Sequence, residues 1–369
     1  MKIAQIANNW SEFNPKTAIG IAAVVRDVST GLVKQGHDVT VFAPEHSEFP
    51  GMKLRCLGKS LKQLGIHLFH ADSPAAQTAY AKGIIGELEG FDLIHSHIEH
   101  VLLPFLKDLR TPVVSTIHGA GFLPREQDIF RKYPQAVFVA LSGHAKLALP
   151  YIHFSAVVYN GIQLDTADYY PQPQPPAYLA WMGRFSENKG VLDAIEASTK
   201  AGEVIVLVGF EERGQEAYFQ KVKDLVDGAM VRLLDIMIRE KKYAFLGNAK
   251  AFLFPIHWEE PFGLVMVEAM ATGTPVIAYN RGSVAEIVRD GVTGFIVNPD
   301  LPNFPDSPDL LIKKRGLEGL VEAIKRIGEI DRAACRKHVE QNFTVEKMVD
   351  GYEQVYQKVL SGTEGKYEK

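Results

Sequence analysis

The sequence predicts two doubly wound α/β domains, and three observations lead to that fold class. At 369 residues the chain is too long for one ordinary hydrophobic core. Short apolar runs alternate with segments of helical periodicity, a pattern typical of parallel sheets with right-handed crossovers. Four prolines in Pro171–Pro176 interrupt this alternation, which then resumes. Because such a segment sustains neither a helix nor a central strand, we interpret it as a stiff linker.

The elements follow in order along the chain. A strand is expected at Lys2–Ala7, a helix at about Ile19–Lys34 closed by Gly36, and a strand at Asp38–Ala43. Further apolar runs predict strands at Phe91–His95, Pro112–His118, Val137–Leu141, Ala156–Tyr159, Tyr178–Met182, Val204–Val208, Ala251–Pro255 and Pro275–Tyr279. The last pattern, Val345–Leu360, is helical.

These patterns divide the chain into an N-terminal Rossmann-like domain over residues 1–168, a linker over 169–176 and a C-terminal Rossmann-like domain over 176–345. A C-terminal helix, at about 346–369, is expected to pack back on the first domain. Ligands of such sheets bind at the carboxyl ends of the strands, so we expect a ligand cleft between the domains.

Composition excludes several classes of function. Hydrophobic residues make up 46% and charged residues 23%, the balance of a globular protein, and the net charge of -4 gives no reason to expect a nucleic acid partner. Two distant cysteines, Cys56 and Cys335, exclude a disulfide framework and fit a reducing cytoplasm. No signal peptide or membrane-spanning run is apparent, so a soluble cytoplasmic protein is expected. Peripheral association with the inner face of a membrane stays open. One segment could form a basic amphipathic face for a lipid acceptor or be an ordinary solvated surface segment; its residues are Lys59, Leu61, Lys62, Leu64 and Ile66.

The most informative stretch runs from Glu259 to Ala278. A buried strand ends at Pro255, a loop carries Glu260, and a helix is expected to start around Pro261 and end before Gly273. The unpaired N–H groups of a helix N-terminus suit a phosphate or hydroxyl oxygen. Glu268 follows eight residues after Glu260, and each carboxylate could hold a vicinal diol of a sugar nucleotide. Two solvated surface glutamates are the alternative.

Basic residues follow the strand Tyr178–Met182. Gly183 permits close backbone approach, while Arg184 and Lys189 place two cations at a strand's carboxyl end. Two positive charges suit a diphosphate that departs with negative charge. An exposed basic turn is the alternative.

These stretches resemble the retaining glycosyltransferases of family GT4, which have the GT-B fold. The first matching pattern begins at Glu260: Glu-Pro-Phe-Gly, a second glutamate eight residues after the first, then Ala-Met-Ala and Gly-Thr-Pro-Val. The Gly-Arg…Lys-Gly element that starts at Gly183 and the His-Gly pair at His118 also match the family. The resemblance covers Lys2 to about Tyr356, with the second domain matching more strongly. One departure is the amino-terminal phosphate loop, where Lys16–Gly20 keeps only Gly20 of the family's adjacent glycines.

The resemblance assigns roles to residues. It implies that Glu260 contacts the transferred sugar, Glu268 the ribose, Arg184 and Lys189 the diphosphate, and that His118 lies beside the donor sugar. It also implies an acceptor-binding N-terminal domain, a donor-binding C-terminal domain and further donor contacts from Gly20, Gly183, Gly209, Pro261, Phe262, Gly263 and Leu264.

The resemblance further implies a hexosyltransferase that moves a sugar from a UDP- or GDP-sugar to an acceptor hydroxyl with retention. No metal and no cofactor are expected. The acceptor is left open among a saccharide, a lipid-linked molecule and a small molecule. A sugar-nucleotide epimerase or phosphorylase on the same fold, and a non-catalytic nucleotide-sugar binder, remain alternatives.

Three further histidines could suggest a metal site. His95 and His97 point the same way on a strand, and His100 would have to fold back to join them. The family shows Asp-x-x-His-x-His here, matched by Asp92, His95 and His97, so a structural or cleft-lining role is favoured.

Overall fold

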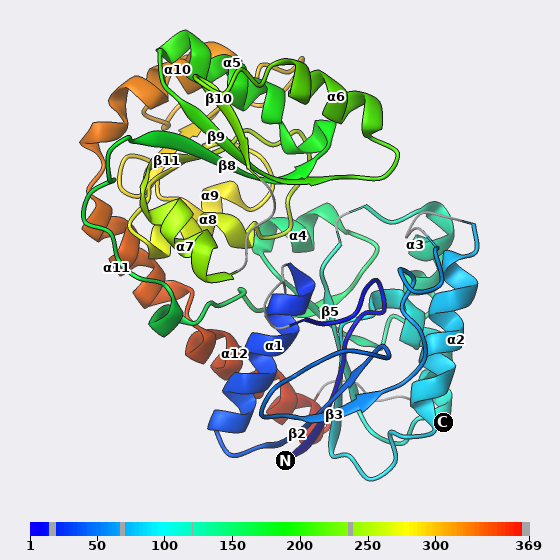
Figure 1. Ribbon diagram of the computed structural model, residues 1–369. Coiled ribbons are helices and arrows are strands. Elements are labelled where there is room, and N and C mark those ends of the chain that lie inside the picture. The colour runs from blue at the N-terminus through cyan, green and yellow to red at the C-terminus, as the bar shows by residue number, and fades with distance from the viewer. Residues whose placement is uncertain (15–19, 67–70, 120, 235–238, 364–369) are drawn as a thin grey trace. The chain divides into compact units, whose positions relative to one another are not determined.

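The computed structural model describes residues 1–14, 20–66, 71–119, 121–234 and 239–363. Internal contacts divide the chain into two units, of which unit 1 comprises residues 1–161 with 345–369 and unit 2 comprises residues 162–344. Figure 1 shows an α/β arrangement in each of them.

Unit 1 is a parallel sheet with the strand order β3-β2-β1-β4-β5-β6-β7. The order reverses between β1 and β4, which makes that pair the topological switch point where ligands of such sheets bind. Its strands are β1 (Lys2–Ile6), β2 (Asp38–Ala43), β3 (Lys53–Cys56), β4 (Leu93–Ser96), β5 (Val113–Ile117), β6 (Val137–Ala140) and β7 (Phe154–Val157). Its helices are α1 (Ile21–Lys34), α2 (Ser73–Ile85), η1 (Glu99–Asp108), α3 (Pro124–Arg131), α4 (Gly143–Ala148) and α12 (Val345–Leu360).

The two faces of this sheet differ. Alternate apolar side chains such as Ala4 and Ile94 pack with residues of α2 and η1 in one hydrophobic core. The intervening positions Gln5, His95 and Thr116 are polar and buried, and α12 meets them through Tyr352 and Tyr356. The C-terminal helix therefore belongs to the core of unit 1, as Figure 1 illustrates for α12 beside α1.

Unit 2 has the strand order β10-β9-β8-β11-β12-β13, again parallel throughout, with its switch point between β8 and β11. Its strands are β8 (Tyr178–Phe185), β9 (Ile205–Glu211), β10 (Val231–Leu234), β11 (Ala249–Phe254), β12 (Val276–Tyr279) and β13 (Gly294–Val297). Its helices are η2 (Leu164–Thr166), η3 (Glu187–Lys189), α5 (Val191–Ala201), α6 (Glu216–Asp224), α7 (Arg239–Gly247), α8 (Leu264–Ala271), α9 (Val284–Ile287), α10 (Gly316–Arg326), η4 (Ile327–Glu329) and α11 (Arg332–Asn342).

The start of the proline-rich segment is bonded into unit 2. The Tyr170 N–H donates to the Thr272 carbonyl over 2.9 Å, and the Arg332 guanidinium donates to the carbonyls of Tyr170, Gly247 and Ala249 over 2.7–2.9 Å. The other six residues of the predicted linker, 171–176, follow before β8 begins at Tyr178, and unit 2 starts at Ile162, before the prolines rather than after them.

The predicted start of the helix after Glu260 is wrong. The helix α8 begins at Leu264, and Pro261-Phe262-Gly263 forms a turn before it. Gly263 has φ 79°, in the left-handed region, where a Cβ would lie 2.5 Å from Cε of Met266. Glu268 therefore lies one turn into the helix.

Candidate functional site

Two glycines bring the ends of β8 and β9 together without side chains. The strand β8 continues through Phe185, so Gly183 and Arg184 lie within it. The sequence analysis had placed these two residues after the strand. Gly183 pairs in register with Gly209 of β9. A Cβ on Gly209 would lie 1.9 Å from the Gly183 carbonyl oxygen, so this position admits no side chain. The result is a close approach of the two strands, without side chains at these two positions, near the carboxyl edge of the sheet.

Lys189 and Glu260 meet at this edge. Lys189 ends η3 after β8, and Glu260 lies in the loop after β11, the strand on the other side of the switch point. The Lys189 Nζ donates to Oε2 of Glu260 over 2.7 Å, and the Trp258 indole N–H donates to the same oxygen over 3.0 Å. The ammonium also lies 4.7 Å from the centroid of the Trp258 ring. The structure thus brings together two of the predicted residues and adds Trp258, which the sequence analysis missed.

Arg184 forms an ion pair with Glu212, whose carboxylate lies in the segment after β9. The sequence analysis did not single out Glu212, which supplies this carboxylate. The doublet Glu211-Glu212 directly after the β9 apolar run is the signal that could have found it.

Glu268 is buried in an ion pair with a residue that the sequence analysis did not single out. The Lys242 Nζ of α7 donates to Oε1 of Glu268 over 2.5 Å. The side chains of Lys242 and Glu268 are 9% and 8% exposed, so each charge depends on the other for compensation. The pairing holds the carboxylate of Glu268 in one orientation on α8.

In unit 1, His118 directly follows β5, and Glu99 fixes its backbone. One carboxylate oxygen of Glu99 accepts the N–H groups of His118 over 3.1 Å and of Gly119 over 2.7 Å. Glu99 has φ 50°, an uncommon conformation for a residue with a side chain and one that concentrates at functional sites. Burial raises the pKa of Glu99 to about 7, against the opposing effect of these two bonds.

The His95, His97 and His100 cluster does not present a set of free ligands. Both ring nitrogens of His95 and both of His97 have protein hydrogen-bond partners. His100 lies edge-on against the rings of Phe122 and Phe130. The role of His95 and His97 in unit 1 is therefore internal hydrogen bonding.

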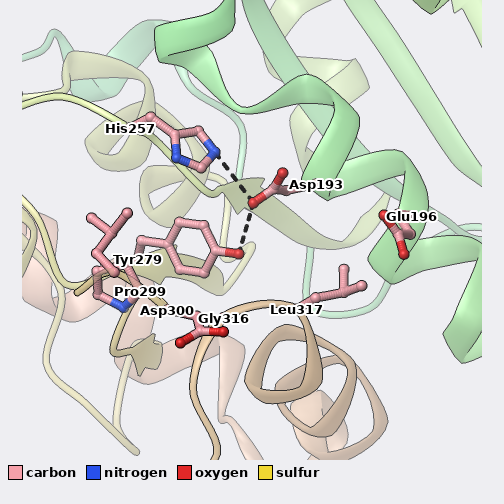
Figure 2. A pocket seen from close by; sticks show the side chains of 9 residues that line it. Asp193, Glu196, His257, Tyr279, Pro299, Asp300, Gly316 and Leu317 are labelled. Atoms are coloured by element: carbon pink, nitrogen blue, oxygen red, sulfur yellow. Dashed lines mark hydrogen bonds and ion pairs between the residues drawn. The ribbon is translucent and has the colours of Figure 1, made fainter.

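A separate acidic pocket in unit 2 escaped sequence analysis (Figure 2). Its volume is about 200 Å³, and its lining comprises Asp193, Glu196, His257, Tyr279, Pro299, Asp300, Leu301, Gly316 and Leu317. Asp193 of α5 receives a hydrogen bond from the Tyr279 hydroxyl at 2.8 Å and pairs with His257 at 3.2 Å. Burial, and then the Asp193 charge, raises the pKa of Tyr279 above its ordinary value, so the phenol stays protonated. None of the predicted donor-binding residues lines this pocket.

The remaining predictions concern the start of the chain. Gly20 caps the N-terminus of α1 with φ 55°, while Lys16 to Ile19 of the predicted phosphate loop lie outside the described residues. The segment Lys59–Ile66, for which a basic amphipathic face was one of two interpretations, has turn structure over residues 61–65, and Leu61 is buried. Among the described helices, none has the length and apolar character that crossing a bilayer requires.

Two family models match the chain. "Glycosyltransferase Family 4" matches residues 19–166, and "Glycosyl transferases group 1" matches residues 168–303. A glycogen synthase of Mycobacterium tuberculosis is 26% identical over 388 residues, covering 91% of this chain and 88% of that protein.

Solved structures show the same fold. A sucrose-phosphate synthase of Thermosynechococcus elongatus aligns with a TM-score of 0.78 at 19% identity, covering 98% of this chain and 99% of that one. The Anabaena protein HepE, in complex with UDP-glucose, aligns with a TM-score of 0.71 at 17% identity, covering 98% of this chain and all (100%) of that one.

Proposed function

Since this chain belongs to the group 1 glycosyltransferases of family 4, we propose that it transfers a sugar from a nucleotide-diphosphate sugar to an acceptor hydroxyl with retention and without a metal. The observation that carries the proposal is the Lys189–Glu260 contact at the carboxyl edge of the unit 2 sheet, where β8 also carries Arg184. There, two cations and the side-chain-free backbone of Gly183 and Gly209 suit a diphosphate.

In this proposal each residue has a stated role. Arg184 and Lys189 exchange their carboxylate partners for diphosphate oxygens and stabilise the charge that develops as the diphosphate leaves. Glu260 orients the transferred sugar, aided by the turn Pro261-Phe262-Gly263 and by Leu264. Glu268, held by Lys242, accepts the ribose hydroxyls. His118 contacts the transferred sugar, as the family resemblance implies.

The reaction itself needs no protein nucleophile. The bond from the anomeric carbon to the leaving phosphate oxygen breaks, and a bond to the acceptor oxygen forms on the same face of the sugar. The acceptor proton passes to the leaving phosphate oxygen, so the diphosphate departs with one proton. Two fixed cations supply the charge compensation that a divalent ion would otherwise provide.

The donor is proposed to be a UDP- or GDP-sugar, and the solved complex of the similar HepE protein with UDP-glucose supports a uridine donor. A thermal-shift screen of UDP-, GDP- and ADP-sugars in EDTA tests this, because a bound ligand raises the melting temperature. We expect one donor class to stabilise the wild type, and Arg184→Ala and Glu268→Ala to lose the shift. Lys250→Ala breaks a different ion pair of unit 2, with Glu203, and serves as the matched control. Shifts that survive both site substitutions would place the donor elsewhere.

Catalysis requires its own experiment, because a non-catalytic binder would pass the thermal-shift screen. Release of nucleotide diphosphate from the stabilising donor, measured with saccharide, lipid-linked and small-molecule acceptors, is expected for the wild type. Glu260→Ala is expected to lower this rate by about a hundredfold, in line with the loss of one preorganised polar group. An unchanged rate in Glu260→Ala would remove that residue from the mechanism.

A further inference from the structure

We propose that Gln5 is a positioning residue that acts through His97 to hold His118 in the tautomer protonated on Nε2, so that Nδ1 of His118 accepts a hydrogen bond from a hydroxyl of the transferred sugar. This deepens the proposed function and rests on it only for the identity of the ligand.

The fold places Gln5 at the start of a hydrogen-bonded path to His118. Gln5 on β1 pairs in register with His95 on β4, across the switch point of the unit 1 sheet. Gln5 and His95 are fully buried, and His97 follows two residues later, just past the end of β4, with the imidazole centroids of His95 and His97 4.2 Å apart. His118 lies beyond His97, after the next strand, β5.

The chemistry of the amide fixes the direction of each hydrogen bond. Oε1 of Gln5 lies 2.9 Å from Nε2 of His97, and a carbonyl oxygen only accepts, so Nε2 of His97 carries the hydrogen. A neutral imidazole protonated there has its lone pair on Nδ1. That Nδ1 lies 2.9 Å from Nε2 of His118, which must therefore donate. Nδ1 of His118 is left with a lone pair, and no described residue donates to it.

Both imidazoles are neutral, as this path requires. Burial lowers the pKa of His118 to about 3 and holds the pKa of His97 well below its ordinary value. One oxygen of the Glu99 carboxyl group accepts the backbone N–H groups of His118 and Gly119. His118 itself is partly exposed to solvent, whereas His97 is buried.

A second branch from Gln5 provides a matched control. Nε2 of Gln5 and the Tyr356 hydroxyl lie 3.3 and 2.7 Å from Nδ1 of His95, whose Nε2 lies 2.8 Å from Oγ1 of Thr116. Tyr356→Phe removes a buried hydroxyl from the same network, but from the branch that does not lead to His118. Gln5→Met removes the amide from both branches, including the contact with His97 that Tyr356→Phe leaves in place.

Nitrogen-15 NMR of histidine-labelled protein distinguishes the two tautomers of each histidine. Variants that each replace one of the 12 histidines assign the signals. In the wild type we expect pyrrole-like Nε2 and pyridine-like Nδ1 signals for both His97 and His118. Gln5→Met should shift their tautomer ratios about fivefold, the effect of one ordinary net hydrogen bond, while Tyr356→Phe leaves them unchanged. A His118 protonated on Nδ1 in the wild type overturns the proposal, and so do unchanged ratios in a folded Gln5→Met. If Gln5→Met does not fold, the tautomers of His97 and His118 in the wild type alone support or overturn the proposal.

The ligand is tested separately. The donor that stabilises the protein should move the Nδ1 signal of His118, whereas the free nucleotide diphosphate should not. Gln5→Met should lower kcat/KM for that donor about fivefold and leave the affinity for free nucleotide unchanged. An unmoved Nδ1 signal with a bound donor overturns the sugar contact. Failure of every nucleotide sugar to bind would contradict the proposed function, while the tautomer measurement would still stand.

Discussion

Lys189 and Glu260, 71 residues apart in the chain, form a 2.7 Å ion pair in which each side chain is about one-seventh exposed (15% and 14%). Because the same ammonium is proposed to bind the diphosphate, Lys189→Met should weaken binding of free nucleotide diphosphate about thirtyfold, the value of one charge-assisted hydrogen bond of about 2 kcal/mol. Isothermal titration calorimetry measures this, with Lys250→Met as the control expected to bind like wild type. Wild-type affinity in Lys189→Met would contradict the assignment.

Glu212 competes for Arg184 in the same way. Glu212→Gln removes the negative charge from the ion pair and keeps the side chain's shape, so nucleotide diphosphate should bind two- to fivefold more tightly, a modest effect because the pair is partly exposed to solvent. The same calorimetric titration measures the change. Weaker binding in Glu212→Gln would mean that Glu212 helps to position Arg184 rather than competing for it.

The buried pair of Lys242 and Glu268 has a consequence for stability. Lys242→Met leaves a buried carboxylate without its partner and should lower the free energy of unfolding by about 3–5 kcal/mol. The double variant Lys242→Met/Glu268→Met leaves no unpaired charge, so it should be more stable than Lys242→Met alone. Urea denaturation of wild type and both variants measures this, and a double variant less stable than Lys242→Met would show that the two charges are not coupled as proposed.

Glu99 should make the stability of the protein depend on pH. Its pKa rises from 4.5 to about 7 on folding, so between these values the folded state binds more protons than the unfolded state. Stability from this group is therefore fully present below pH 4.5 and is lost as the pH rises through 7. Between those pH values the free energy of unfolding of the wild type should fall by about 2 kcal/mol relative to that of Glu99→Gln, as measured by denaturant titration. This value is smaller than the full pKa shift implies because Glu99 is partly exposed to solvent. A difference that does not change with pH would contradict the buried, high-pKa carboxyl.

The predicted family resemblance and fold class are confirmed, and the reason lies in local patterns. Buried strands such as Asp38–Ala43 read as apolar runs, and the helix Val345–Leu360 has the predicted bounds because its apolar residues repeat at helical spacing. The strands β3 and β10 were missed because they are edge strands with mostly exposed side chains, which leaves no apolar run. The strand β13 was also missed, although its side chains are buried.

The candidate site was predictable in its chemical groups and not in its contacts. The spacing of the motifs identified Arg184, Lys189, Glu260 and Glu268. Their partners Glu212 and Lys242 lie 28 and 26 residues away from Arg184 and Glu268, and only the folded chain brings them together. The left-handed conformation of Glu99 likewise depends on tertiary contacts, because nothing local favours it in a residue with a long side chain.

The anomeric configuration of the product, followed by proton NMR in the presence of EDTA, tests the central claim most directly. The account predicts that the transferred sugar keeps the configuration it had in the donor, and that the rate in EDTA equals the rate with added magnesium. An inverted product would contradict same-face transfer. A rate abolished by EDTA would show that Arg184 and Lys189 do not suffice to stabilise the departing diphosphate.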